Sequence, residues 1–404
     1  VSSETFLGLP FTALLFHSLL ASFGFNLQTT TIMLPAVLAA LTVLAIFFLG
    51  AEAGGDRRIG LLAALIFAFC PAYVVRSAVG CFEPASAGIL ALTLLSLFII
   101  KAFKAEVWRR SLVYAFLAGL ALAYLNITWE ACYFAGLLLL GFLLTSIIAG
   151  KYSSRQTSAY LVTLAVGAIL TLPFPQPGLT ILLSAGGLPN LLGIIFAVSH
   201  EGFRRLRLSE ALAASLALTL LAVSGLTFRF SGLTSTLASE AWAAVNPAFR
   251  ESTLEGMLRE ASLDFRPGTW ASTYLALGNL LLFAVLGLWF AARRREPSSL
   301  YFIPFLMASL YASASLMGYS VLAAIPVSFF AALGLFELFK NSGRILTEHG
   351  GRRKPPIARA AIVFPIVVIL LTSMTLTNSA ALIDRPATLA ASMLPGQDKV
   401  DSWE

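Results

Sequence analysis

Long apolar stretches with at most one charged residue each are the feature that most constrains the fold of this chain. A helix needs about 20 predominantly apolar residues to cross the hydrocarbon core of a bilayer, and twelve stretches approach or exceed that length. Hydrophobic residues make up 58% of the chain and charged residues only 12%, whereas soluble domains carry about 25% charged residues. The sequence therefore predicts an all-α polytopic membrane protein of about 12 spans. The predicted spans are 30–50, 59–75, 86–103, 111–127, 129–149, 158–173, 178–198, 209–227, 269–292, 299–314, 318–339 and 358–378.

Basic residues alternate between the loops and indicate the orientation. Of the 27 Lys and Arg residues, 20 fall in every second loop, beginning with Arg57 and Arg58. Cytoplasmic loops carry excess Lys and Arg, so both chain ends and the loops around 76–85 and 228–268 are expected to face outward. The same bias explains the net charge of +7 without nucleic-acid binding. The short apolar stretch 10–23 is expected to lie as a helix at one membrane surface.

A few outward-facing charged residues are candidates for chemistry, and each also has a simpler interpretation. Glu83 lies in a turn between two predicted spans, where a lone acid is usually just solvated. Arg76 can pair with Glu83, or it can bind a phosphate through its planar fork of donors. Asp264 lies near the end of the long loop 228–268, and Trp270 follows just after it. Asp264 is either a solvated acid or a site residue, and Trp270 is either an interface anchor or part of the site.

Glu130 falls at the junction of two predicted spans, where it either reaches lipid headgroups or has a function. Two outward carboxylates from distant loops suit Mg²⁺ or Mn²⁺, but spacing alone does not bring them together. The three cysteines follow no disulfide or zinc pattern. The sequon at Asn126 lies at a helix end, where modification is not expected.

Four local patterns occur in the order found in one known family. The segments that carry them are Gly8–Pro10, Pro71–Glu83, Thr128–Tyr133, and Asn246–Pro247 followed by Ser262–Trp270. With these segments the chain resembles the membrane domain of the oligosaccharyltransferase catalytic subunit, most closely the archaeal AglB type, over residues 6–404. The second pattern is similar to the family's P-x-Y-x-x-R-S-x-x-G-x-x-D run, and the last to its S-V-x-E-x-x-P-x-x-W segment.

The resemblance implies a GT-C glycosyltransferase fold and an inverting transfer of an oligosaccharide. The implied donor is linked to polyprenyl (dolichol-type) pyrophosphate, and the implied acceptor is Asn of an Asn-X-Ser/Thr sequon. By position, Glu83 and Asp264 match the acids that hold Mn²⁺ or Mg²⁺, and Pro267 and Trp270 match the frame of the long-loop motif. Arg76 is the candidate donor-phosphate residue. The implied location is the plasma membrane, with the active side extracellular.

The departures from the family pattern leave other functions open. Glu83 replaces the usual Asp, Asp264 replaces the usual Glu, and Glu130 replaces a small residue. The family's pyrophosphate-binding Arg is absent, because Gly318 and Tyr319 stand at the corresponding distance before a proline. An inactive paralogue acting as a scaffold, an O-mannosyltransferase of the same fold and a transporter are the alternatives.

The resemblance also implies a division of the chain. Residues 1–29 are expected to be the end of the first outer loop, with the interfacial helix. Residues 30–378 are the transmembrane domain, and residues 379–404 lead into a C-terminal soluble domain. The first acidic motif is then expected before Val1, and the sequon-reading WWDYG motif after Glu404.

Overall fold

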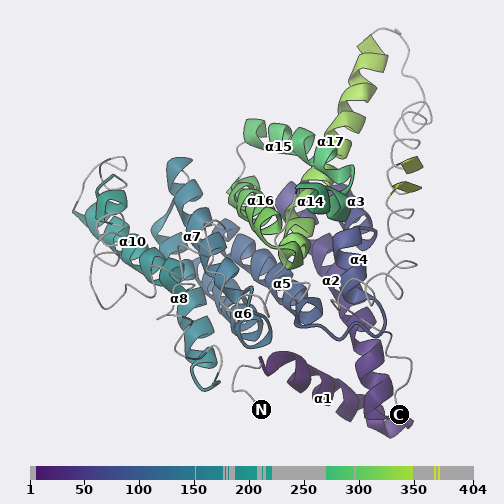
Figure 1. Ribbon diagram of the computed structural model, residues 1–404. Helices are drawn as coiled ribbons and strands as arrows, with labels where there is room; N and C mark the ends of the chain where they lie inside the picture. The colour runs from purple at the N-terminus through teal and green to yellow at the C-terminus, as the bar shows by residue number, and fades with distance from the viewer. Residues whose placement is uncertain are drawn as a thin grey trace.

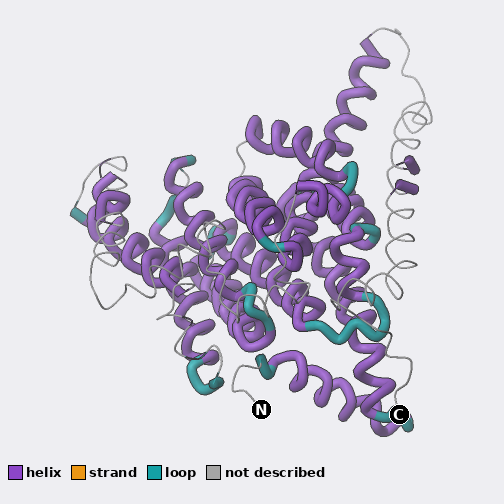
Figure 2. The backbone as a smooth tube through the Cα atoms, in the orientation of Figure 1, coloured by secondary structure: helices purple, strands orange, loops and turns teal. Residues whose placement is uncertain are grey.

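The computed structural model describes residues 6–150, 152–175, 187–206, 215–220, 270–294 and 297–348, with a few isolated positions outside these ranges. This part of the chain folds into helices joined by short loops and contains no strand (Figure 2). The prediction of a mostly helical protein is therefore confirmed for these ranges.

The helices follow one another along the chain with short 3₁₀ turns, labelled η, between some of them. In chain order they are α1 (Gly8–Leu20), η1 (Ala21–Phe23), α2 (Leu27–Gly54), α3 (Arg57–Ala68), α4 (Pro71–Ser77), α5 (Pro84–Lys104), α6 (Trp108–Thr128), α7 (Cys132–Ile148), α8 (Ser154–Thr171), α10 (Leu188–Arg205), α14 (Trp270–Leu277), α15 (Leu280–Arg294), α16 (Pro297–Ser315), η5 (Met317–Tyr319) and α17 (Ser320–Glu348).

Helix α5 lies at the centre of the bundle and packs against both α2 and α6 (Figure 1). Helix α6 packs in turn on α8, while α17 packs on α3, α15 and α16. Small residues allow the closest approaches: Gly287 of α15 lies against the backbone of α17 at Phe330. Such contacts are typical of helices in membranes, where association depends on close packing rather than on hydrophobic burial.

The predicted span 59–75 is two helices rather than one, and this corrects the sequence-based expectation. Helices α3 and α4 meet at an angle of 63°. The break lies at Cys70, whose backbone is extended, with Pro71 as the first residue of α4. Proline lacks the N–H of a continuing helix and disfavours helical geometry in the preceding residue. The bend points α4, and Arg76 in its last turn, in a different direction from α3.

The predicted span 269–292 is also broken, into α14 and α15, which meet at 85°. Gly278 lies between them with φ of +60°. This left-handed conformation is open to glycine because it has no Cβ. The stretch is therefore two helices rather than the one helix expected from the sequence.

Within the described ranges, four helices are long and apolar enough to cross a membrane, and up to six if each bent pair counts as one span. They are α2, α5, α6 and the Met317–Lys340 segment. Shorter apolar helices cover the predicted stretches 10–23, 129–149 and 299–314. The stretch 228–268 lies outside the described residues, and 209–227 and 358–378 are described only in part, so the total of about 12 spans stays a prediction.

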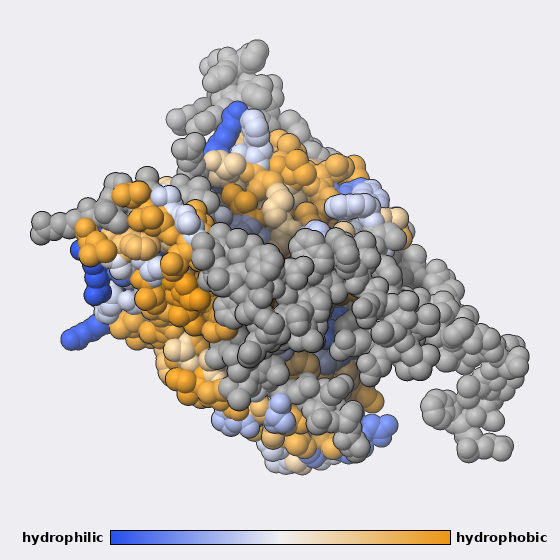
Figure 3. Space-filling model, turned by 60° about the vertical axis from the view of Figure 1, so that its left-hand side comes forward, coloured by the Kyte–Doolittle hydropathy of each residue, from blue (hydrophilic) through white to orange (hydrophobic). Residues whose placement is uncertain are grey.

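Much of the described surface that is visible in Figure 3 is apolar. Many exposed side chains are large hydrophobic ones, including Leu19, Ile169 and Val285. A surface of this kind suits a bilayer better than water.

Candidate functional site

Three interhelical turns from distant parts of the sequence meet around one cavity of about 200 Å³. They are the loop between α4 and α5, the turn between α6 and α7, and η5 before α17. The cavity contains three of the predicted site residues, Arg76, Glu83 and Glu130. The other lining residues are Phe6, Pro84, Ala85, Trp129, Gly318 and Tyr319.

The loop between α4 and α5 is shaped by its glycine and its proline. Gly80 has φ of +89°, and its N–H donates to the Ile32 carbonyl of α2 at 3.0 Å. Pro84 begins α5, so Glu83 occupies the N-cap position. The fixed φ of proline suits the first turn of a helix. The sequence thus holds Glu83 beside the partial positive charge of a helix N-terminus, which favours an acid there.

Arg76 and Glu83 form an ion pair across this loop. Arg76 Nη1 donates to Glu83 Oε2 at 2.5 Å. The Arg76 side chain is 13% exposed and that of Glu83 is 37% exposed. The pair therefore lies at the boundary between the protein interior and its surroundings. Of the two sequence-based interpretations of Arg76, pairing with Glu83 is the arrangement present in the structure.

Glu130 sits in the tight turn between α6 and α7. The Trp129 backbone is extended after the end of α6, and the Cys132 N–H donates to the Trp129 carbonyl at 3.1 Å. The Glu130 carboxylate accepts a hydrogen bond from the Tyr319 hydroxyl, with Oη and Oε1 3.1 Å apart. The Glu130 carboxylate is therefore held by a hydrogen bond to another residue that lines the cavity.

Trp129 packs between the central helix and η5. Its ring centroid lies 6.4 Å from that of Tyr319, and its side chain is buried against Gly88 of α5. A Cβ at Gly88 would lie 2.5 Å from Trp129 Cε3. On the other side, Gly8 at the start of α1 lies directly against Thr128. The two glycines thus allow α1 and α5 to approach the turn that carries Glu130.

The remaining predicted site residues are not brought to the cavity by the described part of the chain. Trp270 begins α14 and is 73% exposed, which is the arrangement expected for an interface anchor. Asp264 and Pro267 lie outside the described residues.

Tyr319 was not predicted as a site residue from the sequence. The one signal in the sequence was that Tyr319 stands close to the position where the family has its pyrophosphate-binding arginine. In the structure this residue instead supplies a hydroxyl to the cavity.

The donor atoms around the cavity suit a divalent metal only in part. Carboxylate oxygens are the ligands that Mg²⁺ and Mn²⁺ prefer, and Glu83 and Glu130 both line the cavity. However, no group of three or more His, Cys, Asp or Glu residues is arranged to hold a metal within the described ranges. A metal bound at this cavity would need at least one further protein ligand or several waters.

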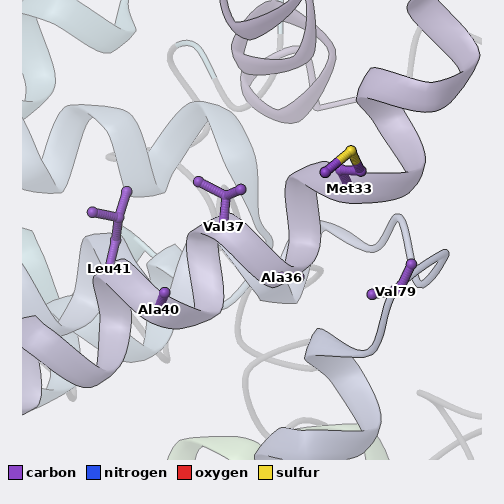
Figure 4. A pocket seen from close by; sticks show the side chains of 6 residues that line it. All are labelled: Met33, Ala36, Val37, Ala40, Leu41 and Val79. Atoms are coloured by element: carbon purple, nitrogen blue, oxygen red, sulfur yellow. The ribbon is translucent and has the colours of Figure 1, made fainter. Parts of the chain in front are cut away.

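A second hollow, of about 350 Å³, runs along one side of α2. Met33, Val37 and Leu41 follow one another along the helix, and Val79 of the α4–α5 loop lies across from them (Figure 4). The lining residues, which also include Ala36 and Ala40, have no polar side chain. This hollow therefore offers no group for catalysis, and the cavity containing Arg76 is the candidate active site.

Comparison of the sequence with known families and proteins gives a consistent result. The profile described as "Oligosaccharyl transferase STT3, N-terminal" matches residues 5–260. The STT3B subunit of dolichyl-diphosphooligosaccharide–protein glycosyltransferase from Oryza sativa subsp. japonica is 24% identical over 360 residues, covering 84% of this chain and 48% of the rice protein. The STT3 subunit from Dictyostelium discoideum is 26% identical over 350 residues, covering 83% and 48%. The chain thus spans about half the length of the curated relatives it matches.

The fold is also similar to that of a solved structure. The archaeal oligosaccharyltransferase AglB from Archaeoglobus fulgidus, in complex with an inhibitory peptide and a dolichol-phosphate, superposes with a TM-score of 0.76 at 18% identity. The match covers 93% of this chain and 47% of the archaeal one. The apo form of the Archaeoglobus fulgidus enzyme gives a TM-score of 0.73. At this level of identity the likeness establishes the fold.

Proposed function

The chain belongs to the STT3 family of oligosaccharyl transferases, and we propose that it forms the membrane domain of an enzyme that glycosylates asparagine side chains. The donor is an oligosaccharide carried on a polyprenyl (pyro)phosphate, and the acceptor is Asn in an Asn-X-Ser/Thr sequon. The cavity containing Arg76 and Glu83 carries this proposal, because it is built by the segment with the most detailed family resemblance, Pro71–Glu83.

The reaction sets clear demands on the site. The amide nitrogen of asparagine attacks the anomeric carbon of the first sugar, and the bond from that carbon to the phosphate oxygen breaks. The lipid pyrophosphate leaves with the bonding electrons, and the amide nitrogen loses one proton. The site must therefore accept a proton, hold a poorly nucleophilic amide in line, and stabilise the negative charge on the leaving group.

The residues around the cavity supply groups for these tasks. Glu83 engages Arg76 through Oε2, and its carboxylate is the proposed group that accepts a hydrogen bond from the acceptor amide. The guanidinium of Arg76 has five N–H donors in a planar fork. The guanidinium is proposed to contact the donor phosphate.

Asp264, with Pro267 and Trp270 as its frame, is proposed to join the site from the long loop 228–268. A divalent cation, Mn²⁺ or Mg²⁺, would be held by Glu83 and Asp264. When bound it would supply positive charge that orients the carboxylates and offsets the charge of the leaving pyrophosphate.

The membrane arrangement is part of the proposal. Twelve spans would place the two chain ends, the cavity and the loop 228–268 on the extracellular side of the plasma membrane. Residues 1–29 would complete the first outer loop, residues 30–378 would form the transmembrane domain, and residues 379–404 would lead into a soluble domain. The alternation of basic loops and the position of the cavity at interhelical turns on a predicted outward side support this orientation.

The full-length protein in membranes tests the proposal directly. It is supplied with lipid-linked oligosaccharide and a fluorescent Asn-X-Thr peptide, and the mobility of the peptide is followed on a gel. Transfer is expected with Mn²⁺, and its loss is expected with chelator, with Arg76→Ala and with Glu83→Ala. Glu52→Gln is the matched control, because Glu52 pairs with Lys104 away from the cavity.

Absence of transfer in wild-type protein that is folded and supplied with its donor would overturn the proposal. That outcome would favour an inactive, scaffold-like member of the family. Transfer that survives both Arg76→Ala and Glu83→Ala would keep the activity but remove these residues from its mechanism.

A further inference from the structure

The Glu130–Tyr319 pair gives the cavity a polar wall that the mechanism above does not use. The Tyr319 hydroxyl donates to Glu130 Oε1 at 3.1 Å, and both residues line the same cavity as Arg76 and Glu83. The resemblance assigns no role to either side chain, since the family has a small residue in place of Glu130 and an arginine at the distance where Tyr319 stands.

The charges around the cavity indicate what this wall does not bind. Glu83 and Glu130 contribute two carboxylates, while among the described residues Arg76 is the only cationic side chain that lines the cavity and is already paired with Glu83. A phosphate placed against Glu130 would meet a like charge in a partly enclosed space, where electrostatic repulsion is stronger than in water. The phosphate therefore belongs on the Arg76 side, and the Glu130 side suits a neutral ligand with hydrogen-bond donors.

The same wall combines hydrogen-bonding and apolar surfaces. A carboxylate accepts strong hydrogen bonds from neutral hydroxyl groups, and the Tyr319 hydroxyl can both donate and accept. Trp129 lies beside them, with its ring centroid 6.4 Å from that of Tyr319. A sugar ring has the matching composition, because its hydroxyls lie at the edge and its C–H bonds form apolar faces. The volume of about 200 Å³ is below the usual range for drug-sized ligands, as expected for a subsite that takes one ring.

We propose that Glu130 and Tyr319 bind hydroxyl groups of the first sugar of the donor, the one joined to the phosphate, and so select which sugar is transferred. This inference rests on the proposed function, because it takes the donor to be a lipid-linked oligosaccharide. With the phosphate on Arg76 and the first sugar on Glu130, the anomeric carbon lies between the two sides of the cavity.

The test is transfer kinetics of the full-length enzyme with natural donor and with donors whose first sugar lacks one hydroxyl. The variants are Glu130→Gln, which keeps the shape and removes the charge, and Tyr319→Phe, which removes only the hydroxyl. The matched controls are Glu52→Gln and Tyr114→Phe. Glu52 pairs with Lys104, and Tyr114 lies near the opposite end of α6. Elution as a single species in size exclusion verifies folding.

The expected result is a rise in KM for the donor with little change in KM for the peptide. Glu130→Gln should raise the donor KM about 10- to 100-fold, and Tyr319→Phe about 3- to 10-fold, since hydrogen bonds to charged groups contribute more than neutral ones. One deoxy donor should have a much higher KM than the natural donor with the wild type. The difference between the two donors should be much smaller with Glu130→Gln, because the charged contact that the deoxy donor lacks is already weakened in this variant.

Two outcomes would overturn the inference while leaving the proposed function intact. One is an unchanged donor KM in both variants, with normal transfer. The other is a rise confined to the KM for the peptide, which would place the acceptor, not the sugar, against Glu130. Failure of the wild type to transfer the natural donor would instead reject the proposed function itself, so the two failures are distinguishable.

Discussion

Replacing Gly88 with alanine tests how tightly α5 holds the turn that carries Glu130. The new Cβ would lie 2.5 Å from Trp129 Cε3 and 2.9 Å from its Cβ and Cδ2. Real Cβ atoms do not approach other atoms so closely, and Trp129 is buried, so it cannot swing into open space. Overpacking of this kind costs typically about 1–3 kcal/mol, and the higher helix propensity of alanine offsets about 1 kcal/mol. The expected net effect is a loss of up to about 2 kcal/mol in the free energy of unfolding.

A second glycine provides the matched control. Gly202 lies in α10 with no atom within 4 Å of where its Cβ would be. Gly202→Ala should therefore gain stability, by up to about 1 kcal/mol. The two variants carry the same chemical change and are expected to shift stability in opposite directions. The measurement is equilibrium unfolding of the purified protein in mixed detergent micelles, with the free energy extrapolated linearly to zero denaturant.

A double-mutant cycle assigns the cost to the contact with the indole. In a Trp129→Phe background the smaller ring lacks the atom closest to the new Cβ, so Gly88→Ala should cost less there than in the wild type. Equal costs in both backgrounds, or a gain in stability for Gly88→Ala like that of Gly202→Ala, would refute the proposed packing of Trp129 against α5.

Three further results are expected. Asn126 should remain unglycosylated despite its sequon, because its side chain is 1% exposed and donates to a threonine of α8; an Asn126→Gln variant that migrates faster than wild type on a gel would contradict this. Cys81 should react with a membrane-impermeant maleimide added from outside, whereas the two buried cysteines should react only after unfolding. Labelling of Cys81 from the cytoplasmic side alone would contradict the proposed orientation. Arg294→Ala should lower the free energy of unfolding by about 3 kcal/mol, because it removes the ion-pair partner of the largely buried Glu337 between α15 and α17. The double variant Arg294→Ala/Glu337→Ala should recover part of this loss in the same unfolding assay.

The sequence predicted the helices well where one uniform apolar stretch forms one helix. The stretch 86–103 corresponds to α5 and 111–127 to α6, each within a few residues of the observed bounds. The bends at Pro71 and Gly278 were not predicted, because average hydropathy over a window is insensitive to one residue that alters backbone geometry. Both residues do carry a local signal, since proline excludes a continuing helix and glycine permits positive φ.

The candidate site was predictable where it depends on residues close in sequence. Arg76 and Glu83 are seven positions apart, and their pairing was one of two interpretations made from the sequence. The pairing of Glu130 with Tyr319 was not foreseen, because it depends on how η5 packs against the α6–α7 turn. Periodicity along a sequence carries no information on which of many similar apolar helices become neighbours.

The two halves of the cavity also differ in when they become available during synthesis. Arg76 and Glu83 leave the ribosome within about 1 s of each other, at the usual rates of about 5–20 residues per second. Tyr319 lies 189 positions after Glu130, so it follows by about 10 to 40 s at the same rates. During that interval the growing chain already has Arg76 and Glu83 and still lacks the opposite wall of the cavity. The proposed sugar subsite is therefore completed only when the helix that begins after Tyr319 packs against the earlier ones.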